Sequence, residues 1–304
     1  MVEKIKVTFL GTSDSIPSAN RNHTSIWLKY KDENILIDCG EGTQRQIRKA
    51  KLNPGKITKI LLTHWHGDHI LGIPGLLQTL ALSKHNKSLT IYGPYGTKKF
   101  MESLFNTFIF VKKFPINIIE VKKEGKFFET SDFRLESKKM THGPPCNAYA
   151  FIKKGKIRID KKKLKKSKLP LGPLIKKLKQ GKDITYNKKK YLVKNLTFKE
   201  EDKKVSIVLD TSINKKIMPF VKNSDLLICE SNYAQDLTSL AKDYNHMTSI
   251  QAANIAKKSN SKKLILTHIS QRYKKNLKKF LNDTKKVFKN SSLADDLDVV
   301  EISK

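Results

Sequence analysis

Short apolar runs bounded by turn or polar residues recur along the chain, and some of them are separated by segments in which apolar positions follow a helical spacing. The runs predict buried β-strands at 7–11, 35–38, 59–64, 89–93, 206–210, 225–230 and 264–268. The helical spacing predicts helices at 42–50, 74–84 and 249–258, the last with Thr248 as its N-cap. Strands that alternate with helices predict an α/β protein.

Several predicted strands end in a side chain that can bind a metal ion or carry a proton. His64 ends the run 59–64, Asp210 ends 206–210 and His268 ends 264–268. Ligand sites in α/β folds gather at the carboxyl ends of the strands. We therefore expect the three side chains to meet in one site.

The charge of the chain predicts a polyanionic partner. Its 304 residues suffice for one large domain or two unequal ones, and 61 Lys and Arg against 28 Asp and Glu give a net charge of +33. Residues 151–204 hold 21 Lys or Arg and 5 Asp or Glu, a net charge of +16. A uniform lysine bias of the whole sequence would explain a basic surface, but it does not explain this concentration.

The basic segment differs from the rest of the chain in pattern as well as in charge. Residues 161–185 combine lysine runs with a Pro-Leu-Gly-Pro turn cluster and only short apolar patches. We expect no core of its own there, and predict a protruding, flexible basic arm at 151–196 inserted into one catalytic domain that spans 1–304.

The cysteines and the N-terminus bear on the cellular setting. Cys39, Cys146 and Cys229 are widely spaced and odd in number, so neither a disulfide framework nor a cysteine zinc site is expected. The chain has no apolar signal core at its start and no run of 18 apolar residues. These features predict a cytoplasmic protein with no membrane partner.

The run Thr-His-Trp-His-Gly-Asp-His at 63–69 places four metal-binding side chains directly after a predicted strand. His64 and His66 can point the same way from an extended segment, whereas Asp68 and His69 are offset and can face a neighbouring ion. With His142, Asp210 and His268 they make a two-metal set with Asp210 as the bridge, a set that suits zinc or a similar divalent ion. Such a pair of ions can activate water against a phosphate ester.

These residues resemble the signature of the metallo-β-lactamase superfamily. Further segments resemble the tRNase Z family within it: 9–13 (FLGTS), 38–46 (DCGEGTQRQ), 246–248 (HMT), 267–273 (THISQRY) and the Gly172-Pro173 pair in the basic arm. The resemblance implies a four-layer αββα sandwich and two Zn²⁺ per subunit, although Mn²⁺ or another divalent ion would suit the same ligands. It assigns His64, His66 and His142 to one ion, Asp68, His69 and His268 to the other, and Asp210 to both. Asp38 would support the ligands from behind.

The resemblance also implies an activity and a partner. A member of this family would be a metal-dependent endoribonuclease that cuts the 3′ trailer from precursor tRNA, leaving a 3′-hydroxyl on the tRNA and a 5′-phosphate on the trailer. Asp68 would orient or deprotonate the attacking water, and His246 would protonate the leaving oxygen. Ser270 and Arg272 would contact phosphate near the scissile bond. Gly172 and Pro173 belong to an arm that in this family commonly reaches across a homodimer, so a homodimer is implied.

One loop departs from the family pattern. The loop that is linked to the tRNA 3′ end commonly reads Pro-x-Lys-x-Arg-Asn, and here it reads Pro17-Ser18-Ala19-Asn20-Arg21-Asn22. Arg21 and Asn22 are retained as expected substrate contacts, whereas Ala19 replaces the lysine. The sequence therefore leaves open whether tRNAs that already carry CCA are rejected.

Two other functions compete with this one. A small-molecule phosphodiesterase or arylsulfatase-like hydrolase could share the metal site, but it needs no basic arm. A tRNA-binding protein with a vestigial metal site could share the arm, but it would be expected to have lost ligands.

Overall fold

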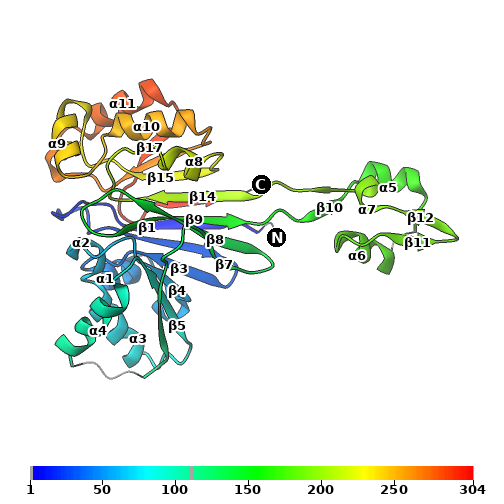
Figure 1. Ribbon diagram of the computed structural model, residues 1–304, viewed down its shortest axis with the longest axis horizontal. Coiled ribbons are helices and arrows are strands. Elements are labelled where there is room, and N and C mark those ends of the chain that lie inside the picture. The colour runs from blue at the N-terminus through cyan, green and yellow to red at the C-terminus, as the bar shows by residue number, and fades with distance from the viewer. Residues whose placement is uncertain (1–2, 110–112, 171, 304) are drawn as a thin grey trace. The chain divides into compact units, whose positions relative to one another are not determined.

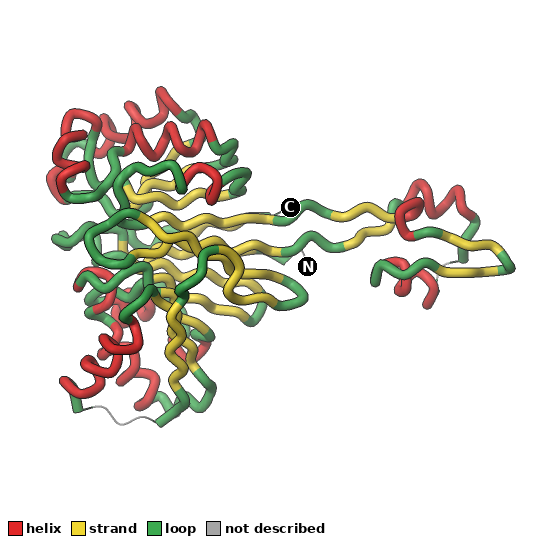
Figure 2. The backbone as a smooth tube through the Cα atoms, in the orientation of Figure 1, coloured by secondary structure: helices red, strands yellow, loops and turns green. Residues whose placement is uncertain are grey.

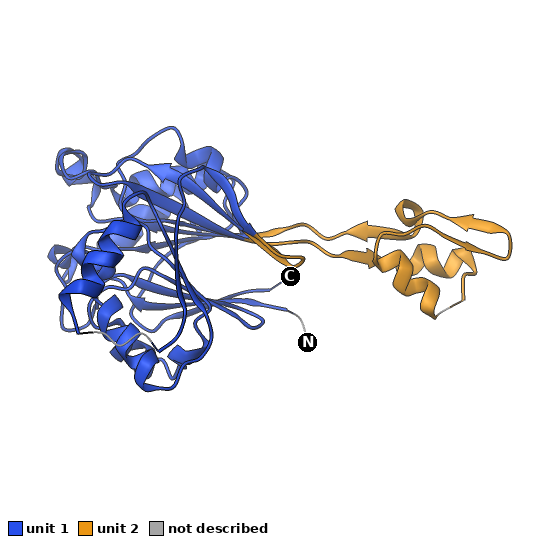
Figure 3. Cartoon of the chain, turned by 60° about the horizontal axis from the view of Figure 1, so that its bottom comes forward, with its two compact units in different colours: residues 1–128, 135–151, 204–304 blue, residues 129–134, 152–203 orange. Residues whose placement is uncertain are grey.

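The computed structural model describes residues 3–109, 113–170 and 172–303. The chain divides into two compact units, which Figure 3 colours separately. The large unit comprises Met1–Phe128, Leu135–Phe151 and Lys204–Lys304, and the small unit comprises Glu129–Arg134 and Ile152–Lys203. The small unit includes most of the predicted arm at 151–196.

Two seven-stranded mixed sheets face each other in the centre of the fold (Figures 1 and 2). The first has the order β18-β1-β2-β3-β4-β5-β6, with parallel pairing from β3 to β6. Its strands are β1 Ile5–Gly11, β2 Ser25–Tyr30, β3 Glu33–Ile37, β4 Lys59–Leu61, β5 Leu89–Gly93, β6 Ile116–Glu120 and β18 Val299–Ile302. The second has the order β17-β16-β15-β14-β9-β8-β7, with parallel pairing from β14 to β17. Its strands are β7 Gly125–Glu129, β8 Phe133–Met140, β9 Cys146–Lys153, β14 Lys203–Val208, β15 Leu226–Glu230, β16 Leu264–Thr267 and β17 Ser291–Leu293.

Helices cover the outer face of each sheet, which gives the four layers of an αββα sandwich (Figure 1). The first sheet is flanked by α1 Thr43–Lys49, the 3₁₀ turn η1 Pro54–Lys56, α2 Gly67–Ile70, α3 Ile73–Leu82 and α4 Thr97–Thr107. The second is flanked by α8 Ile217–Val221, η2 Gln235–Leu237, α9 Thr238–Asp243, α10 Ser249–Lys258, η3 Gln271–Tyr273 and α11 Leu277–Val287. The predicted fold class is confirmed.

All seven predicted strands and all three predicted helices are present, with shifted ends. The run 59–64 leaves the sheet after Leu61, so His64 stands in the loop beyond the strand. Helix α10 begins after Thr248, whose hydroxyl accepts from the backbone N–H of Gln251 in a full capping box. Among the strands that were not predicted is β8, whose buried positions alternate with charged residues on the other face and form no continuous apolar run.

The small unit has a hydrophobic cluster of its own, and the expectation that this segment forms no core is wrong. Its elements are β10 Ile157–Ile159, α5 Lys161–Ser167, α6 Pro173–Lys179, β11 Ile184–Tyr186, β12 Lys189–Tyr191, α7 Val193–Leu196 and β13 Thr197–Lys199. Their buried side chains are Leu164, Leu169, Leu178, Ile184 and Leu196. Short helices and two antiparallel strand pairs, β10–β13 and β11–β12, bring together apolar residues that stand far apart along the sequence.

No helix within the described ranges is long and apolar enough to cross a membrane.

Candidate metal centre

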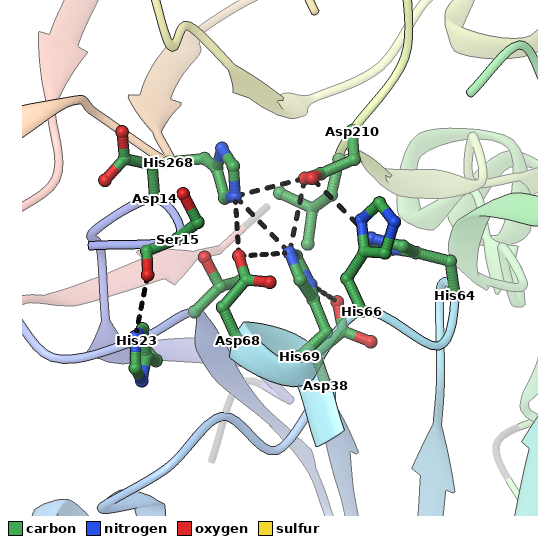
Figure 4. A network of polar contacts seen from close by, with 12 residues as sticks. Asp14, Ser15, His23, Asp38, His64, His66, Asp68, His69, Asp210 and His268 are labelled. Atoms are coloured by element: carbon green, nitrogen blue, oxygen red, sulfur yellow. Dashed lines mark hydrogen bonds and ion pairs between the residues drawn. The ribbon is translucent and has the colours of Figure 1, made fainter. Parts of the chain in front are cut away.

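The polar residues of the site stand where parallel strands end. Asp38 follows β3, His64 follows β4, Asp210 follows β14, Glu230 is the last residue of β15 and His268 follows β16. Parallel pairing places the carboxyl ends of neighbouring strands at one edge of each sheet. Figure 4 shows side chains from both sheets pointing toward one another there. Asp38, Asp210 and His268 all have positive φ, a strained backbone that is common at functional sites.

The motif at 63–69 changes from extended to helical backbone in its middle. His66 is extended and precedes α2, and Asp68 and His69 lie on the first turn of that helix. His64 and His66 consequently point to one group of ligands, and Asp68 and His69 point to another. The offset that the spacing predicted is present.

The first group consists of His64, His66, His142 and Asp210. Nδ1 of His66 lies 3.2 Å from Nε2 of His142. Nε2 of His64 lies 3.6 Å from Oδ2 of Asp210. The other ring nitrogen of His142, Nδ1, faces the carbonyl oxygen of Asn245 at 3.2 Å, which leaves Nε2 directed into the group.

The second group consists of Asp68, His69, Asp210 and His268. Nε2 of His69 lies 3.3 Å from Nε2 of His268 and 3.2 Å from Oδ2 of Asp68. Oδ1 of Asp210 lies 3.3 Å from Nε2 of His268. Asp210 thus turns one oxygen to each group, as a bridging ligand does.

The donor atoms fit divalent metal ions. Nε2 of His64 and Oδ1 of Asp210 are buried without a hydrogen-bond partner, which is costly unless a cation satisfies them. Burial alone would raise the pKa of Asp210, but His268, His69 and His64 hold it well below its usual range. Histidine nitrogens and carboxylate oxygens without cysteine are the donors of catalytic sites for zinc and similar ions.

Asp38 contacts Thr63 and the ring of His69. The buried carboxylate accepts hydrogen bonds from the backbone N–H of Thr63 and from its hydroxyl, each at 2.7 Å. It also lies 2.7 Å from Nδ1 of His69. A proton on that nitrogen fixes the tautomer and leaves Nε2 free to bind metal.

His246 has a buried carboxylate partner, Glu230, that the sequence analysis did not identify. Nδ1 of His246 lies 3.1 Å from Oε2 of Glu230, and Glu230 also accepts from the backbone N–H groups of Thr211 and Met247. Burial alone would lower the pKa of His246, but the Glu230 carboxylate raises it to about 9. The available signal was that Glu230 ends a predicted strand, as His64, Asp210 and His268 do.

The predicted RNA contacts are already engaged within the chain. The Arg21 guanidinium donates to the Thr12 hydroxyl and the Ala294 carbonyl and pairs with Asp295, and Asn22 donates to the carbonyl of Glu41. Ser270 accepts from Nε of Arg272, whose guanidinium lies over the Tyr233 ring. Arg21 and Ser270 line a pocket of about 240 Å³.

Gly172 and Pro173 lie on the small unit, at the exposed start of α6. RNA contact by Arg21, Asn22, Gly172, Pro173, Ser270 and Arg272 stays a prediction.

Solved structures with the same fold match nearly the whole chain. The crystal structure of the short form of human tRNase Z (ELAC1) is 26% identical with a TM-score of 0.71, and the alignment covers 97% of this chain and 98% of that one. The metallo-β-lactamase fold protein YhfI from Bacillus subtilis is 22% identical with a TM-score of 0.73, over 99% of this chain and 100% of that one. Fold and donor set together define a metal-dependent hydrolase of the metallo-β-lactamase fold.

Sequence relatives identify the family within this class of hydrolases. Ribonuclease Z of Oceanobacillus iheyensis is 38% identical over 98% of this chain and 100% of its own length, and Ribonuclease Z of Bacillus thuringiensis (strain Al Hakam) is 37% identical over 96% and 98%. The family described as Anti-Pycsar protein Apyc1 matches residues 5–159, a part that ends before Asp210, His246 and His268. The chain belongs to the ribonuclease Z family, whose members match it through both halves of the site.

Proposed function

We propose that this chain is a metal-dependent endoribonuclease that removes the 3′ trailer from precursor tRNA, leaving a 3′-hydroxyl on the tRNA and a 5′-phosphate on the trailer. The observation that carries the proposal is the convergence of two His/Asp ligand groups and the His246–Glu230 pair at one edge of the sandwich. Full-length similarity to proteins named Ribonuclease Z, and to human tRNase Z, supports the substrate.

We propose that the two groups hold two Zn²⁺ per subunit, with Mn²⁺ as a substitute. Divalent ions bound there would supply positive charge to the scissile phosphate and lower the pKa of a water molecule. Asp68, whose side chain is 9% exposed and keeps a pKa well below its usual range, stays ionised to orient that water. His246 holds a proton and donates it to the leaving 3′-oxygen.

The ring of His246 is placed for this role. Its centre lies 5.3 Å from that of His142 and 5.4 Å from that of His268, one ligand from each group. Glu230 occupies Nδ1, so Nε2 is the nitrogen left to serve the substrate. A donor of this kind contributes about 10²- to 10⁴-fold to turnover.

We propose that the basic segment 151–196 binds the body of the tRNA. Residues 151–204 carry a net charge of +16, almost all of it lysine, which suits phosphates rather than base edges. Gly172 and Pro173, exposed at the start of α6, present part of this surface. Arg21, Asn22, Ser270 and Arg272 are the proposed contacts near the scissile phosphate.

We propose that the chain forms a homodimer through an apolar patch, which comprises the exposed side chains of Leu71, Leu82 and Phe108 and the groove between α3 and α4. Residues 70–83 contain no charged side chain, although 29% of the chain is charged. Leu71, Leu82 and Phe108 are exposed there, and a groove of about 400 Å³ runs between the two helices. Two chains of charge +33 repel each other least through a face with few charges. The three buried free thiols suit a reducing compartment, and we propose the cytoplasm.

The experiment that tests the function is cleavage of an end-labelled precursor tRNA with a 3′ trailer, with Zn²⁺ or Mn²⁺ supplied and the cut mapped to the nucleotide. A single cut next to the discriminator nucleotide, absent from Asp68→Ala, is expected. A parallel substrate that carries CCA tests the consequence of Ala19. Tight binding without cleavage by either metal would favour a tRNA-binding protein. Cleavage of small phosphodiesters alone would favour a small-molecule hydrolase.

A further inference from the structure

A further pocket lies beside the loop that carries His142. Its volume is about 440 Å³, and the residues that line it include Tyr95, Lys122, Lys139, Met140, Pro145 and Asn147. Met140 and Pro145 stand at the two ends of the loop that carries His142. The pocket is formed entirely by the large unit.

Hydrogen bonds tie the walls of this pocket to the metal motif. The backbone N–H of Asn147 donates to the carbonyl of Thr63, the residue before His64, at 2.9 Å. Trp65, between His64 and His66, donates to the Thr97 hydroxyl, and that hydroxyl donates to the carbonyl of Pro94 beside Tyr95. A chain bound in the pocket would therefore lie next to the first ligand group.

The surface of the pocket combines an open aromatic ring with cations. Tyr95 is 68% exposed, and Nζ of Lys122 lies 5.6 Å from the centre of its ring and 3.4 Å from Oε2 of Glu120. Lys139, which is also exposed, lines the pocket from the end of β8. A single exposed tyrosine is common on protein surfaces, but an aromatic face with lysines around a hollow is the arrangement that binds single-stranded nucleic acid.

We propose that this pocket, which we call the trailer pocket (Tyr95, Lys122 and Lys139), binds the first nucleotides of the 3′ trailer. The inference rests on the proposed function and adds a subsite to it. Tyr95 stacks on a base, and the two lysines neutralise phosphates. Bases of the tRNA acceptor stem are stacked inside a duplex, whereas the bases of a single-stranded trailer offer free faces.

The pocket lined by Arg21 and Ser270 supports the direction in which the RNA strand runs. Arg21 and Ser270 line a hollow beside the second ligand group, next to the loop at 17–22 that is expected to hold the mature 3′ end. The trailer pocket is linked instead to the first ligand group, through the hydrogen bond from Asn147 to Thr63, the residue before His64. An RNA strand that crosses both ligand groups with the mature 3′ end of the tRNA at Arg21 places its trailer at Tyr95.

The test compares two precursors of the same tRNA, one with a single-nucleotide trailer and one with a trailer of several nucleotides. Tyr95→Ala is expected to raise KM for the long trailer about tenfold, the loss of one base–aromatic stack, and to change kcat little. KM for the single-nucleotide trailer changes much less. Tyr95→Phe, which keeps the stacking face, behaves as wild type. A Lys122→Ala/Lys139→Ala double variant lowers the salt dependence of KM for the long trailer, whereas Lys286→Ala on α11 does not.

A photo-crosslinking base at the second trailer nucleotide gives a readout that does not depend on turnover. It is expected to attach to the segment around Tyr95. Equal KM changes for both trailers, or a crosslink confined to other segments, would overturn the trailer pocket while leaving cleavage of precursor tRNA intact. Failure of the wild-type protein to cut either precursor would instead overturn the proposed function.

Discussion

Nδ1 of His246 lies 3.1 Å from Oε2 of Glu230, a carboxylate that is fully buried at the end of β15. His246 lies in the loop between α9 and α10. Glu230, a residue of the second sheet, therefore orients a ring that belongs to a loop. Glu230 also accepts two backbone N–H groups, which holds it in place. The pair places one oriented imidazole ring beside both ligand groups.

The pH profile of turnover tests this pair. Because the pKa of His246 is raised to about 9, its protonated form persists as the pH rises and is lost above that value. Glu230→Gln removes the charge that raises the pKa, so the alkaline limb of kcat is expected to move to lower pH, and kcat falls. The measurement is kcat for cleavage of precursor tRNA at saturating substrate across pH. Glu102→Gln, on the exposed face of α4, is the control. An alkaline limb at the same pH in Glu230→Gln would contradict the role of Glu230.

Asp38→Asn tests the support behind the ligands. Asparagine tolerates the positive φ of this position, so the substitution removes charge with little change of backbone. Loss of the carboxylate that orients His69 is expected to weaken metal affinity about 10- to 100-fold. The measurement is a zinc titration against a competing chelator, with the rise in Tm on metal addition as the second readout. Asp32→Asn, on an exposed turn, should leave both unchanged.

The sequence predicted which side chains the structure brings together in the two ligand groups, because these residues lie in one short segment or at the ends of strands. The motif at 63–69 holds four donors in one segment, and His142, Asp210 and His268 each stand at or just beyond the end of a strand. Glu230 also ends a strand, but its meaning depends on a hydrogen bond to a loop histidine 16 residues later. A periodic sequence pattern does not predict this hydrogen bond, because the path of the chain around α9 determines whether the two residues meet.

The hydrophobic cluster of the small unit was not predicted, for a related reason. Its buried residues, such as Leu164, Leu178 and Leu196, are isolated among lysines and give no window with a clear period. The lysine-rich helices keep their charge exposed while single leucines pack together. Composition therefore predicted the charge of the segment correctly and its lack of a core wrongly.

The oligomeric state tests the apolar patch. Leu71→Glu places a charge on an exposed position of the patch, so it should not disturb folding. We expect it to convert a dimer into a monomer, because burying an unpaired carboxylate in an apolar interface is costly. Light scattering after size exclusion measures the mass. Val299→Glu, on the edge strand β18 and similarly exposed, is the matched control. A wild-type monomer, or a dimer that survives Leu71→Glu, would contradict the interface.

Replacement of the basic arm separates binding from chemistry. Strands β9 and β14 are neighbours in the second sheet, so a short Gly-Asn turn can replace residues 155–201 and keep both strands. The shortened protein is expected to bind precursor tRNA more weakly and with a flatter dependence on salt, since fewer phosphates are neutralised. Cleavage of bis(p-nitrophenyl) phosphate should persist, because every residue of the two ligand groups lies in the large unit. A folded, metal-bound variant that has lost the small-substrate activity would show that the arm contributes to the active site, and an unchanged salt slope would remove its lysines from the RNA interface.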